Sequence, residues 1–106
     1  MSDLLMRQQV FAEMAAMLIL QAVKMGYGVT LGDAYRDPRC PYGAENSLHK
    51  MRLAIDLNLF RNGKFLERTE DHEPLGEWWE SKGGTWGGRF TPADGNHYSL
   101  PWRNLK

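Results

Sequence analysis

The chain has 106 residues, and its 13 basic and 13 acidic side chains give a formal net charge of zero. This length predicts one domain, residues 1–106, with a modest core. Zero net charge argues against a nucleic-acid-binding protein and against attraction to anionic membranes. The single cysteine, Cys40, excludes an internal disulfide and fits a protein that folds in a reducing compartment. We also expect a monomer.

The N-terminal segment, Asp3 to Met25, predicts a long helix. Apolar side chains recur at helical spacing along it, at Phe11, Met14, Ala15, Leu18, Ala22 and Met25. Others make it apolar nearly all round, namely Met6, Met17, Ile19 and Leu20. We therefore expect a largely buried core helix, in preference to a binding surface for a partner helix. The apolar stretch is too short for a membrane span, and no cleavage site follows it, so we expect no leader peptide.

Residues 29–36 predict a short extended segment, and the Pro and Gly content of 37–43 predicts a loop. The clearest strand is Leu53 to Phe60, in which Leu53, Ile55, Leu57 and Leu59 share one face. Asp56 lies on the opposite face of this strand and should point into a cleft. Asn62-Gly63 then predicts a hairpin turn.

A second helix is expected over Glu73 to Lys82, with His72 as part of its solvated cap. Residues 85–92 are rich in glycine and aromatic side chains, and residues 96–102 predict a short strand. Together these elements predict an α+β fold, with helices on one face of a small antiparallel sheet and a functional site on the other.

Four residues carry the chemistry that the sequence offers. His49, Asp56 and His97 supply two imidazoles and one carboxylate, a ligand set that suits a catalytic zinc and leaves a position for water. Asp94, three residues before His97, could accept a proton from that water. A step of seven residues within one regular strand would place His49 and Asp56 on opposite faces and far apart. We therefore expect His49 to lie before the strand, in a bend held by Ser47 that folds back over the Asp56 face.

This pattern resembles the zinc peptidases that cleave bacterial cell-wall peptides, a family of D-alanyl-D-alanine carboxypeptidases, dipeptidases and phage L-alanyl-D-glutamate endopeptidases. The family shape is S-x-H, then A-x-D, then a late acidic-x-x-His, and it is matched here by Ser47, His49, Ala54, Asp56, Asp94 and His97. Arg52 departs from it, since many members have a small residue there, often glycine. The likeness runs from about residue 32 to 100 and implies Zn²⁺ at His49, Asp56 and His97, with Asp94 as general base.

The resemblance also implies substrate contacts. Arg36 matches the family's substrate-binding arginine, and its guanidinium could bind a stem-peptide carboxylate in a fork; its alternative role is an ordinary salt bridge. Ser47 could contact the same substrate or only the backbone. Trp86, flanked by glycines, is a candidate cleft wall, although aromatic residues in this span are more often core.

The function expected from this resemblance is zinc-dependent hydrolysis of a peptide bond in peptidoglycan, by an L-alanyl-D-glutamate endopeptidase acting as a phage endolysin. Such an enzyme would stay in the host cytoplasm until a pore-forming partner released it to the cell wall. The alternatives are a D-alanyl-D-alanine carboxypeptidase or dipeptidase, a non-catalytic zinc-containing wall-binding or virion module, and a small scaffold without metal.

Overall fold

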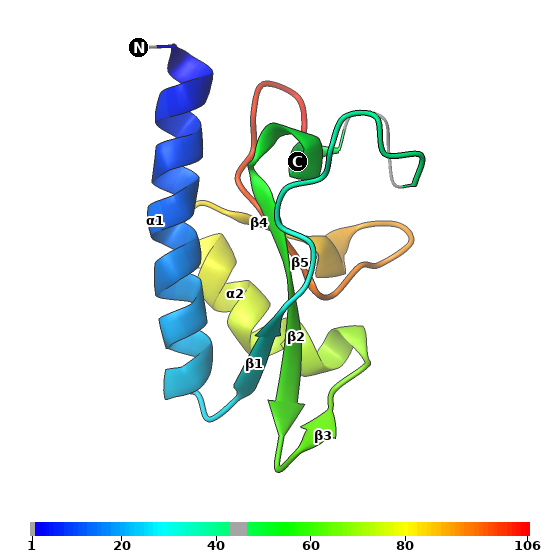
Figure 1. Ribbon diagram of the computed structural model, residues 1–106. Coiled ribbons are helices and arrows are strands. Elements are labelled where there is room, and N and C mark those ends of the chain that lie inside the picture. The colour runs from blue at the N-terminus through cyan, green and yellow to red at the C-terminus, as the bar shows by residue number, and fades with distance from the viewer. Residues whose placement is uncertain (1, 43–46) are drawn as a thin grey trace.

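The computed structural model describes residues 2–42 and 47–106. It has the expected α+β fold, with two helices and a five-stranded antiparallel sheet (Figure 1). The helices and strands are α1 (Asp3–Lys24), β1 (Gly28–Leu31), β2 (Ala54–Arg61), β3 (Lys64–Phe65), α2 (Glu73–Ser81), β4 (Thr85–Trp86) and β5 (His97–Ser99). Short 3₁₀ turns lie at Leu48–Met51, Thr69–His72 and Gly87–Arg89.

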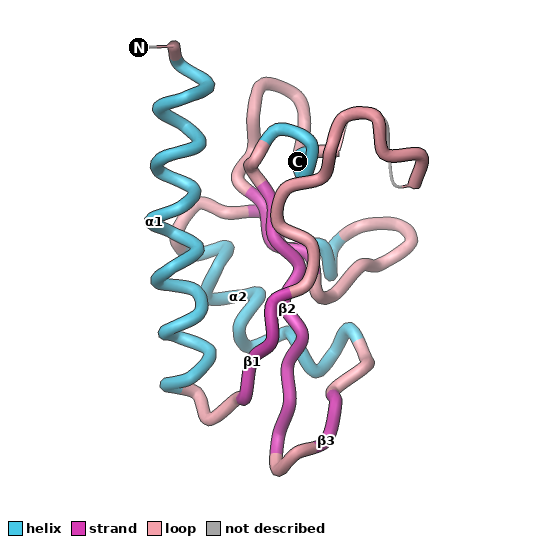
Figure 2. Tube along the Cα trace, in the orientation of Figure 1, coloured by secondary structure: helices cyan, strands magenta, loops and turns pink. Residues whose placement is uncertain are grey.

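The sheet is built around β2, the longest strand. The strand order is β1-β2-β5-β4, and β3 pairs with the end of β2 through the predicted Asn62-Gly63 hairpin (Figure 2). Both turn residues have positive φ, 53° at Asn62 and 75° at Gly63, as a tight hairpin requires. β4 was not predicted as a strand, because two residues are too few to show a periodicity.

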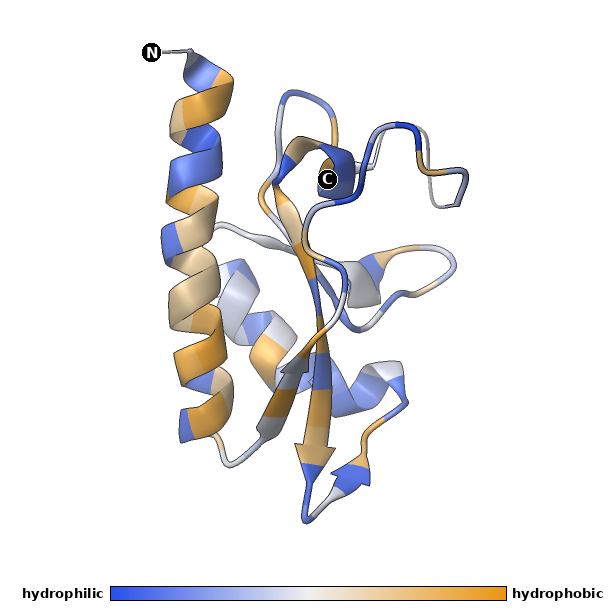
Figure 3. Ribbon diagram, viewed as in Figure 1, coloured by the Kyte–Doolittle hydropathy of each residue, from blue (hydrophilic) through white to orange (hydrophobic). Residues whose placement is uncertain are grey.

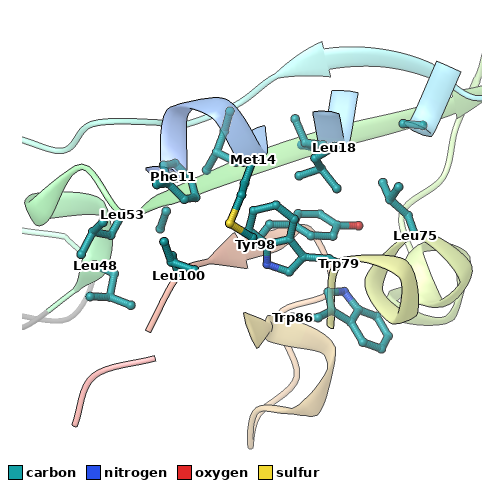
Figure 4. Packing of buried hydrophobic residues seen from close by; sticks show 14 of the residues in the cluster. Phe11, Met14, Leu18, Leu48, Leu53, Leu75, Trp79, Trp86, Tyr98 and Leu100 are labelled. Carbon is teal, nitrogen blue, oxygen red and sulfur yellow. The ribbon is translucent and has the colours of Figure 1, made fainter. Parts of the chain in front are cut away.

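The alternation along β2 is confirmed. Ile55, Leu57 and Leu59 are buried, whereas Asp56 is half-buried on the opposite face. The core on the first side joins both helices to the sheet, with Trp79 of α2 packed edge-on against Phe11 of α1 and against Tyr98 of β5 (Figure 4). The helices therefore cover one face of the sheet and leave the Asp56 face for another purpose.

Helix α1 has the predicted extent to within one residue, but the prediction that it is largely buried is wrong. Its buried residues are Phe11, Met14, Leu18 and Ala22, which lie on one face. Large apolar side chains on the rest of the helix are exposed, at Leu5, Met6, Val10, Met17, Leu20 and Val23. Figure 3 shows apolar residues round most of the C-terminal half of α1. No helix among the described residues is long and apolar enough to cross a bilayer.

His72 takes the expected place at the N-cap of α2, but its expected exposure to solvent is wrong. It is only 3 % exposed, so it is no solvated cap, and its Nδ1 lies 2.8 Å from the Tyr98 hydroxyl in a buried hydrogen bond. The charged residues just before His72 in the sequence suggested an exposed position. The contact with Tyr98 of β5 could not be predicted from the spacing of residues in the sequence.

Candidate active site

The structure brings His49, Asp56 and His97 together. One potential ligand atom from each residue lies within 4.8 Å of those of the other two, in a group that could hold a metal ion. His49 Nε2 is 3.1 Å from Asp56 Oδ1, and His97 Nδ1 is 3.9 Å from the same oxygen. Two ligands at about 2.1 Å from a tetrahedral zinc lie about 3.4 Å apart, so these separations fit one ion after small adjustments.

His49 reaches this group through the predicted bend. Ser47 caps the 3₁₀ turn Leu48–Met51, and its Oγ accepts a hydrogen bond from the His49 backbone N–H at 3.2 Å. Arg52 ends the turn with φ of 59°, in the left-handed region that favours glycine. This reversal sends the chain back into β2, so that the His49 ring lies beside Asp56.

Strand pairing places the other two side chains side by side. Asp56 of β2 is directly opposite His97 of β5 in the antiparallel register. Directly opposite residues carry their side chains on the same face of a sheet, with β-carbons about 5 Å apart. The backbone of His97 is fixed in turn by its N–H, which donates to the Asp94 carbonyl at 3.1 Å.

The orientation of the His49 ring is set by its second nitrogen. Nδ1 lies 3.1 Å from the Ala34 carbonyl, which can only accept, so Nδ1 carries the proton and Nε2 faces Asp56. A backbone carbonyl in this role is typical of metal-binding histidines. Burial alone would lower the pKa of His49, but the nearby Asp56 carboxylate raises it above its ordinary value. A metal ion bound to Nε2 would take the place of a proton on that nitrogen.

Three buried atoms beside this pocket make no hydrogen bond with the described residues. They are Asp56 Oδ1, His97 Nε2 and Arg36 Nε. Burial, and next the nearby charge of His49, lowers the pKa of His97 to about 4, so this ring is neutral at pH 7. Unpaired buried polar atoms cost folding free energy unless a ligand satisfies them. A neutral imidazole and an open carboxylate oxygen are donors that suit a divalent cation.

Asp94 lies at the edge of this group. It follows a turn in which its backbone N–H donates to the Gly87 carbonyl at 2.8 Å. Its side chain reaches solvent, yet partial desolvation, and next the charge of Asp56, raises the pKa of Asp94 above its ordinary value. A raised pKa favours a carboxylate that must accept a proton and then release it. Asp94 borders the pocket of about 360 Å³ that also contains His49, Asp56 and His97.

Arg36 enters the same pocket from the loop after β1. Its side chain is 10 % exposed, its Nη2 pairs with Asp33 Oδ2 at 3.2 Å, and its Nη1 donates to Ser47 Oγ at 3.4 Å. Its guanidinium also stacks on Tyr42, 5.0 Å from the ring centre. Arg36 is thus held by neighbours while it borders the cavity, and Ser47 contacts both the backbone and this arginine.

Trp86 does not lie in the cleft wall that the sequence suggested for it. It is 1 % exposed, and its indole N–H donates to the Gly95 carbonyl at 2.7 Å. The neighbouring glycines serve this packing: a β-carbon at Gly76 or Gly88 would overlap the indole ring. Trp86 therefore supports the turn that carries Asp94 from inside the core, and the substrate-contact prediction for Trp86 is corrected.

Three residues at the site were not predicted from the sequence. Asp33 pairs with Arg36, and Phe90 packs against the His97 ring with 5.2 Å between centres. Gly87 lies so close to the Asp94 turn that a β-carbon there would overlap the Asp94 carbonyl and come within 2.7 Å of the His97 β-carbon. The glycine-rich composition of 83–88 was the only signal, and it did not distinguish which glycine approaches the site.

Comparison with known proteins agrees with this arrangement. A family model described as D-alanyl-D-alanine carboxypeptidase matches residues 42–100, more than half of the chain. The matched segment contains His49, Asp56, Asp94 and His97, and Arg36 lies before it. No curated protein matches the chain significantly.

Proposed function

The chain belongs to the D-alanyl-D-alanine carboxypeptidase family of peptidases, and from this membership we propose that it is a zinc peptidase of bacterial peptidoglycan. In this proposal His49, Asp56 and His97 hold the zinc. The observation that carries it is the convergence of these three side chains beside Asp94, with an Asp56 Oδ1 that lies within 3.9 Å of both imidazoles and makes no hydrogen bond with the described residues. A bound zinc would polarise the scissile carbonyl and lower the pKa of a bound water to about 7.

The residues of the chain perform the remaining tasks in this mechanism. Asp94 accepts the proton of the attacking water and delivers it to the leaving amine, a role for which its raised pKa is suited. Arg36 binds a carboxylate of the stem peptide through two parallel N–H groups and thereby positions the scissile bond. Asp33 and Ser47 hold the guanidinium so that little entropy is lost when substrate binds.

We favour an L-alanyl-D-glutamate endopeptidase among the members of this family. Asp94 borders two pockets: the catalytic one, and a second of about 270 Å³ on the side of Arg68 and Thr69. Space on both sides of the general base supports a substrate that continues past the scissile bond in both directions. A role as a phage endolysin, delivered to the wall through a pore-forming partner, is part of this proposal.

The second candidate is a D-alanyl-D-alanine carboxypeptidase, which the description of the matching family favours. In that reaction Arg36 would bind the terminal carboxylate of the leaving D-alanine.

Digestion of purified peptidoglycan, followed by mass spectrometry of the new termini, separates the two candidates. An endopeptidase exposes a new amino group on D-glutamate, whereas a carboxypeptidase releases free D-alanine. An Asp94→Asn digest measures background cleavage, and Asp37→Asn, an exposed carboxylate outside both pockets, is the matched control. Absence of any new terminus with zinc-loaded wild-type protein would reject both candidates.

A further inference from the structure

The outward face of α1 carries a regular stripe of exposed side chains. They are Met6, Val10, Glu13, Met17, Leu20 and Lys24, each separated from the next by four, three, four, three and four residues. This is the spacing of the contact positions in paired helices. Leu20 is 69 % exposed and Met6 53 % exposed, so these side chains do not pack into the core of their own chain.

The stripe lies on a different face of α1 from the one that packs on the sheet. At about 100° per residue, its centre is turned by roughly 125° from the core residues Phe11, Met14, Leu18 and Ala22. α1 lies along one edge of the molecule, with the rest of the chain on its other side (Figure 1). A second helix can therefore approach the stripe without meeting the sheet or the pocket of Asp94.

The charges of the stripe indicate what covers it. Its only two charged members are one acid, Glu13, and one base, Lys24. If two copies of α1 run antiparallel, with Met17 of each beside Leu20 of the other, each Glu13 lies beside Lys24 of the second copy. A parallel pair would place like charges together, which is unfavourable. An anionic membrane surface would require a basic polar face, which the stripe does not offer.

We propose that the chain forms an antiparallel dimer through residues 13–24 of this stripe, with Met17 and Leu20 at the centre of the contact and two Glu13–Lys24 pairs at its ends, while Met6 and Val10 lie beyond the contact. A monomer is the expectation from the sequence, and the oligomeric state in solution decides between the two. The dimer leaves both pockets around Asp94 open, so each copy keeps an independent site.

Sedimentation velocity over a concentration series from micromolar upwards tests the proposal on the full chain. Wild-type protein should form dimers, and Leu20→Glu should weaken association at least about tenfold, because it places two added charges in the apolar centre. Circular dichroism of Leu20→Glu should match wild type, since the side chain is exposed. Wild-type protein that stays monomeric at the highest concentration would overturn the proposal.

Charge reversal tests the register. Glu13→Lys and Lys24→Glu should each weaken the dimer, and the double variant should restore it, because only the antiparallel register pairs these two positions. Glu70→Lys and Lys64→Glu change the net charge equally at exposed positions outside the stripe and should have no effect. Single reversals that leave the dimer unchanged would contradict the register. Monomeric protein that cosediments with phosphatidylethanolamine–phosphatidylglycerol vesicles would instead assign the face to a membrane.

Discussion

The protein has two buried histidine environments, and they differ in what their neighbours leave unpaired. His72 and His97 are 3 % and 6 % exposed, and burial lowers the pKa of each to about 4. His72 is paired with the Tyr98 hydroxyl inside the core. His97 faces His49 and Asp56, and its Nε2 and the Asp56 Oδ1 make no hydrogen bond with the described residues.

The comparison shows that a depressed pKa alone does not identify a functional histidine. Burial has the same effect on both rings, whether or not they serve chemistry. The distinguishing observations are a second histidine, a carboxylate in register across two strands, and buried atoms that a cation would satisfy. Substitutions at the metal site should therefore change turnover or metal content, whereas substitution of His72 should change the pH dependence of stability.

The largest effect is expected for Asp94→Asn, which removes the proton acceptor and keeps the size of the side chain. Turnover on peptidoglycan should fall by about a hundredfold to ten-thousandfold, with folding and metal content unchanged. The rate of appearance of new amino termini measures it, with Asp37→Asn as control. Wild-type turnover in Asp94→Asn would mean that Asp94 is only a turn residue.

On the structural side, His72 should make the stability of the metal-free protein depend on pH. The pKa of His72 is about 4 in the folded protein, against 6.5 ordinarily, so the unfolded chain binds its proton first as the pH falls. Above pH 6.5 His72 does not reduce the free energy of unfolding. As the pH falls from about 6.5 to 4, the free energy of unfolding decreases because of His72, by at most about 3 kcal/mol.

Urea unfolding at pH 7.5 and pH 5 measures this dependence. His72→Phe should be less sensitive to the change of pH than wild type, with the remaining slope arising in part from His97. Equal slopes for the two proteins would show that His72 takes up its proton without cost in the folded state.

A smaller effect is expected at the substrate contact. Arg36→Lys keeps the charge but loses the planar fork, and kcat/KM should fall roughly tenfold. Arg39→Lys is the matched control, because Arg39 is exposed and pairs only with Asp37 among the described residues. Equal loss of activity on fragments with and without the recognised carboxylate would separate Arg36 from substrate recognition.

The sequence predicted the elements whose signal is local. The alternation of apolar and other residues around Asp56 predicted β2 and the face of β2 that the helices do not cover. Ser47 predicted the bend that carries His49. The pairing of Asp56 with His97 was not predictable, because register depends on the hydrogen bonds between strands far apart in the chain. Trp86 was misplaced for the same reason: its hydrogen bond to Gly95 and the glycines that pack on its ring depend on tertiary contacts.

The central claim is that His49, Asp56 and His97 form one metal site, whereas His72 is structural. Zinc content of purified wild type, His97→Ala and His72→Phe, measured by elemental analysis after dialysis against limiting zinc, tests it most directly. We expect one zinc per chain in wild type and in His72→Phe, and little zinc in His97→Ala. Full occupancy in His97→Ala, or loss of zinc in a folded His72→Phe, would contradict the account.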